Sequence, residues 1–444
     1  MSARIEDAPG SGEAETVLAA DRPGRPAWIA LSALLVVYLV NFMDRQLFAV
    51  LQEEIRADLN LSDSQLALLG GTMFAVFYAT LGLPLAWLAD RTNRIRLIAI
   101  SCAVWSVFTA LSGAATNFLT MALARIGVAS GEAGGVSPSY SVISDYFPPA
   151  RRGLAIGIFT IGAPLGLMAG TALGALIADT LGWRWAFVLL GLPGVLLAIV
   201  LAVLVKEPER GRQDPEAQTA APLRPLDAVR AVFGTPTLLL LTAAAAATSF
   251  AGYGLYQWAP SFLIRSQGLS LETVGVFLAP IFALGLIGAV GGGAIADRLG
   301  QKRPSAYAFV PALALLIAAP FHIAALSVAD GRASLALLVV PTILSYAWIG
   351  PGLAAAQTLS RPEIRASVAA IIGFFNNLIG FGLGPLLIGA ISDWLRPSLG
   401  EGEALRIALL CGMIVYVLAA LLFLAAAVTL PRDLARSRAG ASSA

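Results

Sequence analysis

The stretch LADRTNRIR at residues 88–96 returns almost unchanged as IADRLGQKR at residues 295–303. Each copy lies where one long apolar run ends and the next begins. This repeat predicts that the chain consists of two halves that arose by duplication, each of them a bundle of helices. Two such halves around a site at the membrane midplane are the architecture of alternating-access transporters.

The composition is that of a membrane protein. Apolar residues make up 58% of the 444 residues and charged residues only 13%, with a mean hydropathy of +0.79. Hydrocarbon is spanned by about 20 helical residues. The apolar stretches therefore predict an all-α membrane fold with about twelve spans, at 28–50, 64–89, 97–114, 118–145, 153–179, 183–205, 236–264, 272–296, 304–328, 333–358, 366–393 and 405–430.

Polar segments between these stretches predict the domain boundaries. The first residues are polar and lack the apolar core of a signal peptide. The segment between the halves contains Pro residues and then an amphipathic stretch, LDAVRAVF at 226–233, which favours a helix on the membrane surface. We expect a disordered tail at 1–26, a six-helix bundle at 27–205, a linker at 206–235, a second six-helix bundle at 236–430 and a tail at 431–444.

The distribution of Lys and Arg predicts the orientation. With the N-terminus inside, 21 of the 29 basic residues fall in inner segments and 6 in outer segments. Cytoplasmic loops retain positive charge, so both termini are expected in the cytoplasm. The Arg-rich linker and the short tails favour a compact bacterial protein, which would lie in the inner membrane. The basic residues thus set the topology, and the net charge of +2 indicates no nucleic-acid partner.

Catalytic and metal-binding chemistry is not indicated. The chain has one His, and its two Cys residues, Cys102 and Cys411, both fall inside predicted helices. Neither an HExxH motif nor a GxSxG elbow is present. We therefore expect neither an enzyme nor a metal site.

Charges inside the bilayer are the strongest functional signal, because they are expensive and are usually functional or paired. Asp44 and Arg45 lie in NFMDRQLF on the first span, and Arg125 and Glu132 lie in LARIGVASGEAGG on the fourth. Residues seven apart share one helix face, so Arg125 and Glu132 are expected to line one cavity wall. Similar depths predict an ion pair between Asp44 and Arg125.

These four charges allow two interpretations. In the first, a proton on Asp44 or Glu132 frees Arg45 or Arg125 to bind an anionic group, which would couple transport to protons. In the second, two acids and two bases form a permanent neutral brace. We favour the first, with the proton as coupling ion and no other cofactor.

The second half has no Asp, Glu, Lys or Arg at membrane depth. Its one ionisable candidate, His322, is expected to be an ordinary residue near the outer end of the ninth span. Neutral hydrogen-bonding and aromatic residues predict a substrate cavity wall formed by Tyr253, Gln257, Trp258, Tyr346, Asn376 and Asn377. A cavity with one charged and one apolar wall suits an amphiphile with a charged head.

The repeated stretch resembles the signature loop of the major facilitator superfamily, in which an Asp-Arg pair, a turn Gly and further basic residues join the second and third helices of each half. Asp90, Arg91 and Arg94 fit the first copy, and Asp297 and Arg298 fit the second. The resemblance covers the whole chain. We expect these five residues to form a conformational latch, in which each Asp contacts the opposite half in only one state.

A narrower resemblance is to the spinster branch of that superfamily, carried by NFMDRQLFAVL at 41–51 and by ARIGVASGEAGGVSPSYSVISDYFPPARRG at 124–153. It implies proton-linked transport of a lysophospholipid or a sphingosine phosphate. By motif, the functional residues would be Asp44, Arg45, Arg125 and Glu132. The implied partners are this substrate and the membrane lipids, and we expect a monomer.

Other functions remain open at this point. Symporters of small organic anions in the same superfamily share the Asn-x-x-Asp-Arg motif, which NFMDR satisfies, and exporters of drugs are a related alternative. A membrane sensor that transports nothing, or an enzyme acting on lipid, is the alternative of another class. Substrate-dependent solute flux would separate a transporter from both.

Overall fold

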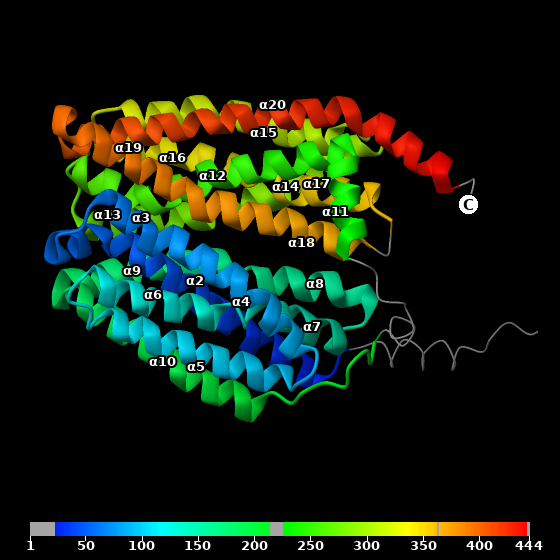
Figure 1. Cartoon of the computed structure of the whole chain (residues 1–444), viewed down its shortest axis with the longest axis horizontal. Coiled ribbons are helices and arrows are strands. Elements are labelled where there is room, and N and C mark those ends of the chain that lie inside the picture. Colours follow the sequence, from blue (N-terminus) through cyan, green and yellow to red (C-terminus); the bar gives the residue numbers. More distant parts are fainter. Residues whose placement is uncertain (1–22, 214–224, 362–363, 442–444) are drawn as a thin grey trace, which may run out of the picture.

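The computed structural model describes residues 23–213, 225–361 and 364–441. Its helices run along the long axis of the molecule and form two bundles side by side (Figure 1). The first bundle contains α2 (Arg25–Leu59), α3 (Asp63–Ala67), the π-helical η1 (Leu68–Thr72), α4 (Met73–Ala89), α5 (Arg94–Ser112), α6 (Phe118–Glu132), α7 (Val136–Tyr146), α8 (Pro149–Thr160), α9 (Gly162–Leu181) and α10 (Trp183–Leu204).

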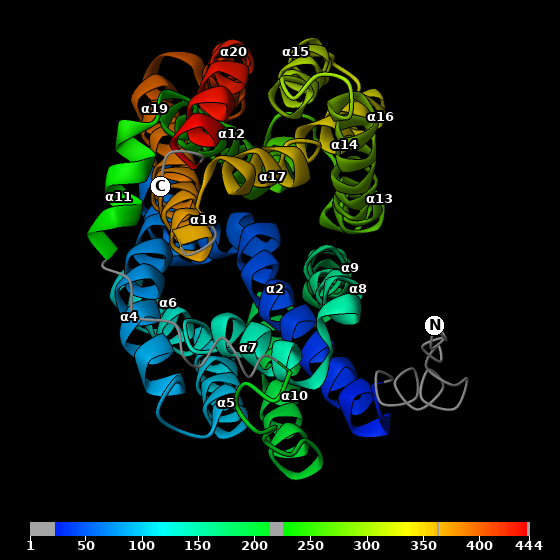
Figure 2. The same ribbon diagram turned by 90° about the vertical axis from the view of Figure 1, so that its right-hand side faces the viewer.

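The second bundle repeats this arrangement. It contains α12 (Pro236–Arg265), α13 (Leu271–Ala283), α14 (Gly285–Gly300), α15 (Ala306–Ser327), α16 (Gly331–Ser345), α17 (Ile349–Leu359), α18 (Arg365–Phe375), the π-helical η4 (Asn376–Leu383), α19 (Gly384–Leu399) and α20 (Glu401–Ala441). Figure 2 looks onto the end of the molecule at which α2 begins and α20 ends, here named the termini face. The opposite end is named the distal face.

The predicted number of spans agrees with the structure. Within the described residues, eleven helical segments are long and apolar enough to cross a membrane. The predicted span at 118–145 is divided into α6 and α7 by a turn at Ala133–Gly135, so neither piece reaches the spanning length alone. Counted as one span, these two helices complete a fold of six spans in each bundle.

Two predicted boundaries differ from the structure. The last helix does not end at residue 430 but continues as α20 to Ala441. The reason is a tertiary contact, because the carboxylate of Asp433 accepts hydrogen bonds from the backbone N–H (3.0 Å) and hydroxyl (2.7 Å) of Thr237 at the start of α12. The predicted tail at 1–26 lies almost wholly outside the described residues, and α2 begins at Arg25.

The linker contains the helix that its sequence indicates. Residues 226–233 belong to α11 (Pro225–Gly234), which lies across the bundle axis and packs against α12 and α18 (Figure 1). Ala228 and Val232 are buried, whereas Val229 and Phe233 are exposed. An apolar residue on the exposed face fits a helix that lies on a membrane surface.

The outer surface of the helices suits a lipid environment. Leu83, Val203 and Trp394 are each at least 75% exposed, and many other large apolar side chains on the spans are exposed as well. A soluble monomer rarely exposes so much contiguous apolar surface. The chain is an integral membrane protein with several spans.

Glycines on α9 fix the position of α2, the helix that carries Asp44 and Arg45. A Cβ atom on Gly166 would lie 2.3 Å from the carbonyl oxygen of Leu39, and one on Gly170 would lie 2.5 Å from that of Met43. Small residues at these positions let the two backbones approach closely, as in many membrane helix pairs.

We expect Gly166→Val to separate α2 from α9 and to lower the melting temperature of the purified protein in detergent. Overpacking of a tight contact costs about 1–3 kcal/mol. Gly157→Val on α8 is the matched control, because a Cβ atom there meets no atom within 4 Å. Equal melting temperatures for the two variants would show that the α2–α9 contact is not tight.

Candidate functional site

A cavity of about 450 Å³ lies between the two bundles. From the first bundle it is lined by residues of α2, α8 and α9, and Arg45 is the one charged side chain among the described residues that line it. From the second bundle it is lined by α12, α13, α14, α15, α16, α17, η4 and α20, with mainly aromatic and small polar side chains. The opposite wall is neutral, as expected, but the charged wall consists of Arg45 alone. Arg125 and Glu132, which were expected to line it, are buried behind the cavity lining.

The six predicted second-bundle residues fall into three groups: three line the cavity, one lines an adjoining pocket and two line neither. Tyr253, Tyr346 and Asn376 line the cavity. Gln257 lines a smaller adjoining pocket beside Arg45 and donates a hydrogen bond to the carbonyl oxygen of Leu66 in the first bundle (3.3 Å).

Trp258 and Asn377 do not line the cavity, so their prediction as cavity residues is wrong. Trp258 is fully buried, and its indole N–H donates to the carbonyl oxygen of Pro385 at 3.0 Å. The amide of Asn377 donates to the carbonyl oxygen of Gly373, one turn earlier on its own helix, at 2.9 Å. The side chains of two adjacent helix residues point in directions about 100° apart. The rotation of the helix about its axis therefore decides which of the two faces the cavity.

Arg45 and Glu132 form the ion pair at the cavity wall. The Nε of Arg45 lies 2.6 Å from Oε2 of Glu132, whose side chain is fully buried, while the side chain of Arg45 is 10% exposed. The guanidinium of Arg45 also lies over the rings of Phe74 (4.7 Å) and Tyr78 (5.0 Å). Aromatic faces and a carboxylate thus hold the cation at the edge of the cavity.

The predicted pair between Asp44 and Arg125 is not formed. Asp44 is completely buried and accepts a hydrogen bond from the hydroxyl of Thr109 at 3.1 Å. Arg125 is 1% exposed and lies over the rings of Phe48 (5.1 Å) and Phe74 (5.5 Å). Depth in the membrane suggested this pair, but the rotation of α2 turns Asp44 toward α5 and leaves Arg45 to meet Glu132.

Several polar atoms of this charged cluster, defined as Asp44, Arg45, Arg125 and Glu132, have no partner. Among the described residues, Oδ1 of Asp44 and both Nε and Nη1 of Arg125 make no hydrogen bond. Burying an unpaired charge costs several kcal/mol. The hydrogen-bonding capacity of the cluster is therefore only partly used in this arrangement.

Glycines position Glu132 at the end of α6. A Cβ atom on Gly127 would lie 2.3 Å from the ring of Phe108, and one on Gly131 would lie 2.6 Å from the backbone nitrogen of Trp105. The small residues at these positions allow α5 and α6 to approach each other closely. A larger side chain at Gly127 or Gly131 would not fit without movement of α5.

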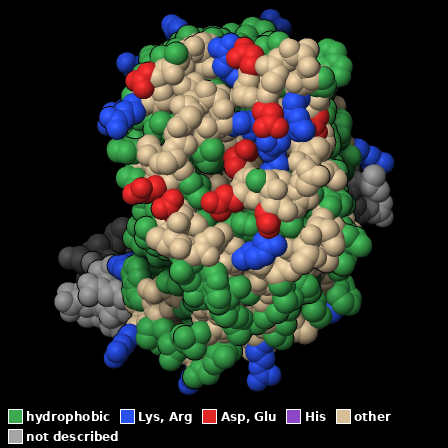
Figure 3. All heavy atoms as spheres, turned by 90° about the vertical axis from the view of Figure 1, so that its left-hand side faces the viewer, with side chains coloured by type: hydrophobic (Ala, Val, Ile, Leu, Met, Phe, Trp, Pro, Cys, Tyr) green, Lys and Arg blue, Asp and Glu red, His purple; other side chains and the backbone are tan. Residues whose placement is uncertain are grey.

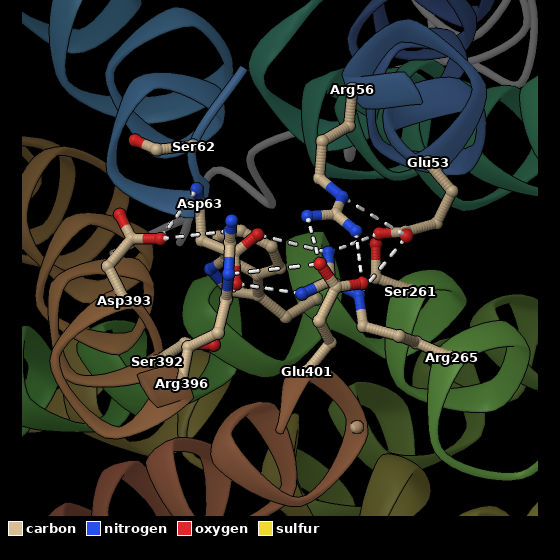
Figure 4. Close-up of polar contacts among 12 residues, drawn as sticks. Glu53, Arg56, Ser62, Asp63, Ser261, Arg265, Ser392, Asp393, Arg396 and Glu401 are labelled. Atoms are coloured by element: carbon tan, nitrogen blue, oxygen red, sulfur yellow. Dashed lines mark hydrogen bonds and ion pairs between the residues drawn. The ribbon is translucent and has the colours of Figure 1, made fainter. Parts of the chain in front are cut away.

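A second polar cluster joins the bundles at the distal face and was not predicted. This distal network consists of Glu53, Arg56, Asp63, Arg265, Asp393 and Glu401 (Figure 4). Arg265 of the second bundle donates to both carboxylate oxygens of Asp63 (2.7 and 3.0 Å) and to both of Glu53 (2.6 and 3.1 Å). Figure 3 shows charged side chains of both signs on this face.

Two more contacts extend the distal network. The carboxylate of Asp393, near the end of α19, accepts hydrogen bonds from the backbone N–H groups of Asp63 (3.0 Å) and Ser64 (2.8 Å) at the start of α3. A carboxylate at a helix N-terminus is stabilised by the free N–H groups and the helix dipole. The guanidinium of Arg56 binds the carboxylate of Glu401.

The distal network lies between the cavity and the distal face. On α2, the lining residues Tyr38, Phe42 and Arg45 all precede Gln52, whose amide donates to Ser261 of the second bundle at 2.5 Å. On α12, the lining residues likewise precede Ser261. The network therefore separates the cavity from the distal face.

The predicted latch residues make contacts within their own parts of the chain. Arg94 binds Asp145 (2.5 Å) and Glu207 (2.6 Å), and the guanidinium of Arg91 lies 3.8 Å from the centre of the Trp87 ring.

Asp90 and Asp297 also make contacts within their own half of the chain or with the linker. Arg210 of the linker donates to the carbonyl oxygens of Ala89, at 2.6 Å, and Asp90. Asp297 accepts a hydrogen bond from the hydroxyl of Tyr307 at 2.8 Å, and Arg298 is exposed. A latch that closes in another state stays a prediction.

The fold consists of two six-span bundles around a cavity with one cationic wall. A polar network joins the bundles at one face, and this arrangement is that of a membrane transporter. The chain belongs to the Major Facilitator Superfamily, whose family model matches residues 34–385. As a member of a transporter family, it is not an enzyme.

The chain is similar to transporters of more than one kind. The chain is 35% identical to an MFS-type efflux pump of Mycolicibacterium smegmatis, over 88% of this chain and 90% of that one. It is 31% identical to human protein spinster homolog 1 (94% and 83% covered) and 28% identical to the sphingosine-1-phosphate transporter SPNS2 of Danio rerio (91% and 84% covered).

A solved structure agrees with this grouping. It is the crystal structure of a bacterial homologue of the human lysosomal transporter spinster, in an inward-facing and unoccupied conformation. It superposes with a TM-score of 0.85 at 29% identity, covering 92% of this chain and 98% of that one. The expected resemblance to spinster-type members of the superfamily is thus confirmed.

Proposed function

We propose that the protein moves an anionic or zwitterionic lipid-like molecule, of the lysophospholipid or sphingosine-phosphate type, by alternating access. The observation that carries this proposal is the cavity itself, with Arg45 on one wall and neutral aromatic residues on the other. A guanidinium binds phosphate through two parallel hydrogen bonds, and the aromatic wall suits a hydrocarbon body. The likeness to a sphingosine-1-phosphate transporter supports the same class.

We propose that protons drive this transport, with no other cofactor. In the present arrangement the guanidinium of Arg45 is held in an ion pair with the carboxylate of Glu132. A proton on Glu132 would neutralise the carboxylate and release the guanidinium to an anionic head group. Asp44, buried without an ion-pair partner among the described residues, is the second proton acceptor in this scheme. Because these groups interact, they titrate as a set.

We propose that the termini face is cytoplasmic, in a bacterial inner membrane, and that the protein works as a monomer. The excess of Lys and Arg in the segments on that side supports this orientation. The distal network would then close the outer side of an inward-facing state. Opening of that side requires the network to break, and the latch residues Asp90, Arg91, Arg94, Asp297 and Arg298 would hold the inner side closed instead.

A second candidate is the export of drugs or small organic anions. It is favoured by the similarity to an MFS-type efflux pump. The single cation in the cavity lining argues against a small dicarboxylate, because two carboxylates would share one guanidinium and face a neutral opposite wall.

Proton flux in proteoliposomes tests the proposal and its alternative. We expect a lysophospholipid or sphingosine phosphate to start proton movement, reported by a pH-sensitive dye, whereas a small dicarboxylate does not. Protein-free liposomes control for leakage caused by the lipid. Flux with the dicarboxylate alone would assign the protein to the organic anion transporters.

A further inference from the structure

Polar atoms on the second-bundle wall of the cavity have no role in the transport steps described above. Tyr256 on α12, His322 on α15 and Ser345 on α16 all line the cavity. The hydroxyl oxygen of Tyr256 and Nδ1 of His322 are buried and make no hydrogen bond to any described residue. His322 as a whole is only 1% exposed. Leaving such atoms unpaired is costly, so each of them needs a partner that the protein fold does not supply.

Aromatic packing holds these groups in place. The imidazole of His322 stacks on the ring of Tyr416, with the ring centres 4.8 Å apart and the planes 7° from parallel. The ring of Tyr256 packs against Phe282 at 4.9 Å. Both contacts restrict side-chain rotation. The hydrogen-bonding atoms are therefore preorganised, which reduces the entropy lost when a ligand binds.

The chemistry of this wall selects a neutral ligand group. Its buried polar atoms without a hydrogen-bond partner belong to a phenol (Tyr256), an imidazole (His322) and a hydroxyl (Ser345), and the charged lining residue, Arg45, belongs to the first bundle. A phosphate or a carboxylate would find no cation on the second-bundle wall. A hydroxyl or an amide can donate one hydrogen bond and accept another, which matches the two kinds of atom present.

We propose that Tyr256 and His322, with Ser345 beside them, form a subsite for a neutral hydroxyl or amide group within the body of the substrate. This proposal rests on the proposed function, in which the charged head group lies at Arg45. It narrows the substrate class to single-chain amphiphiles with a free hydroxyl or amide between the head and the hydrocarbon chain. Amphiphiles without such a group would leave the two buried atoms unpaired and bind more weakly.

Binding of a matched pair of lipids to the purified full-length protein tests the subsite. The probes are 1-acyl lysophosphatidylcholine and its 2-deoxy analogue, which lacks only the free glycerol hydroxyl. We expect the natural protein to bind the first about tenfold more tightly, as for the loss of a buried hydrogen bond in a binding site. In Tyr256→Phe and His322→Phe, the difference between the two lipids should shrink toward onefold.

The two variants keep the aromatic packing, and Tyr256→Phe also removes an unpaired buried hydroxyl. Its melting temperature without ligand should therefore equal or exceed that of the natural protein, which a purely structural role for this hydroxyl would not produce. Tyr140→Phe is the matched control, because Tyr140 packs on Phe159 outside the cavity lining and should keep the tenfold difference.

The possible results separate the two proposals. Equal binding of both lipids by the natural protein would overturn the subsite and leave the lipid-like substrate class standing. A tenfold difference that persists in both variants would also overturn it. If neither lipid binds to the natural protein, the proposed substrate class fails, and the subsite fails with it.

Discussion

Glu132→Gln is expected to reduce substrate-driven proton flux by about 100-fold or more. Glutamine keeps the shape of glutamate but cannot take up a proton, and it leaves Arg45 without its ion-pair partner at 2.6 Å. Removing one member of a buried pair costs about 3–5 kcal/mol, so the melting temperature should fall as well. The measurement is the dye-detected proton flux in proteoliposomes with lysophospholipid.

Two companion variants make this result specific. Asp44→Asn should also reduce coupling, but it removes a buried carboxyl without an ion-pair partner among the described residues, so its melting temperature should stay equal or rise. Glu272→Gln, at an exposed position in the first turn of α13, is the matched control and should behave as the natural protein does. Full proton flux in Glu132→Gln would contradict the proposed role of the Arg45–Glu132 pair.

Arg265→Ala is expected to open the distal face. This residue makes four hydrogen bonds to the two first-bundle carboxylates of Glu53 and Asp63. Its loss leaves Asp63 buried without its cation, at a cost of about 3–5 kcal/mol to the closed arrangement. A shift of this size changes the ratio of the two states by about two to four orders of magnitude.

The measurement is the distance between spin labels at the exposed residues Ala57 and Ser398, which lie near the distal face on different bundles. The labels are introduced after Cys102 and Cys411 have been replaced. We expect a longer distance to gain population in Arg265→Ala. Arg406→Ala is the control, because Arg406 pairs with Glu403 on its own helix. An unchanged distance in Arg265→Ala would show that the distal network does not hold the bundles together.

Much of the fold could be predicted because it follows from local patterns. The length of each apolar run, the repeat at 88–96 and 295–303 and the Lys and Arg distribution are all visible along the chain. The division of the fourth span at Ala133–Gly135 was not predicted, because the apolar run continues through it. The extension of α20 past residue 430 was missed because it depends on a contact between Asp433 and Thr237, almost 200 residues away in the chain.

The candidate site was predicted by residue type but not by pairing. Charge at membrane depth drew attention to α2 and α6, which the Arg45–Glu132 ion pair joins, yet depth alone could not tell whether Asp44 or Arg45 faces Glu132. Neighbouring residues on a helix point about 100° apart, and the rotation of α2 is set by its packing on the glycines of α9. No local pattern reports that rotation.

No local pattern in the sequence indicates the distal network. Its members lie at helix ends and in short connections, where charged residues are common in any membrane protein. Asp393 illustrates this, since its partners Asp63 and Ser64 are some 330 residues away. His322 was predicted to be an ordinary residue, because nothing in the ninth span indicates that it stacks on Tyr416 beside the cavity.

The uneven distribution of charge between the two walls has a consequence for how such a protein can diversify. Among the described residues, the one charged side chain that lines the cavity, Arg45, belongs to the first bundle, whereas the second bundle contributes a neutral wall. In the proposed scheme, the proton acceptors Asp44 and Glu132 belong to the first bundle, and the subsite for the body of the substrate belongs to the second. In that scheme, substitutions on the second-bundle wall can change which substrate body is accepted and leave the proton acceptors in place, which fits a family that includes an efflux pump and a sphingosine-1-phosphate transporter.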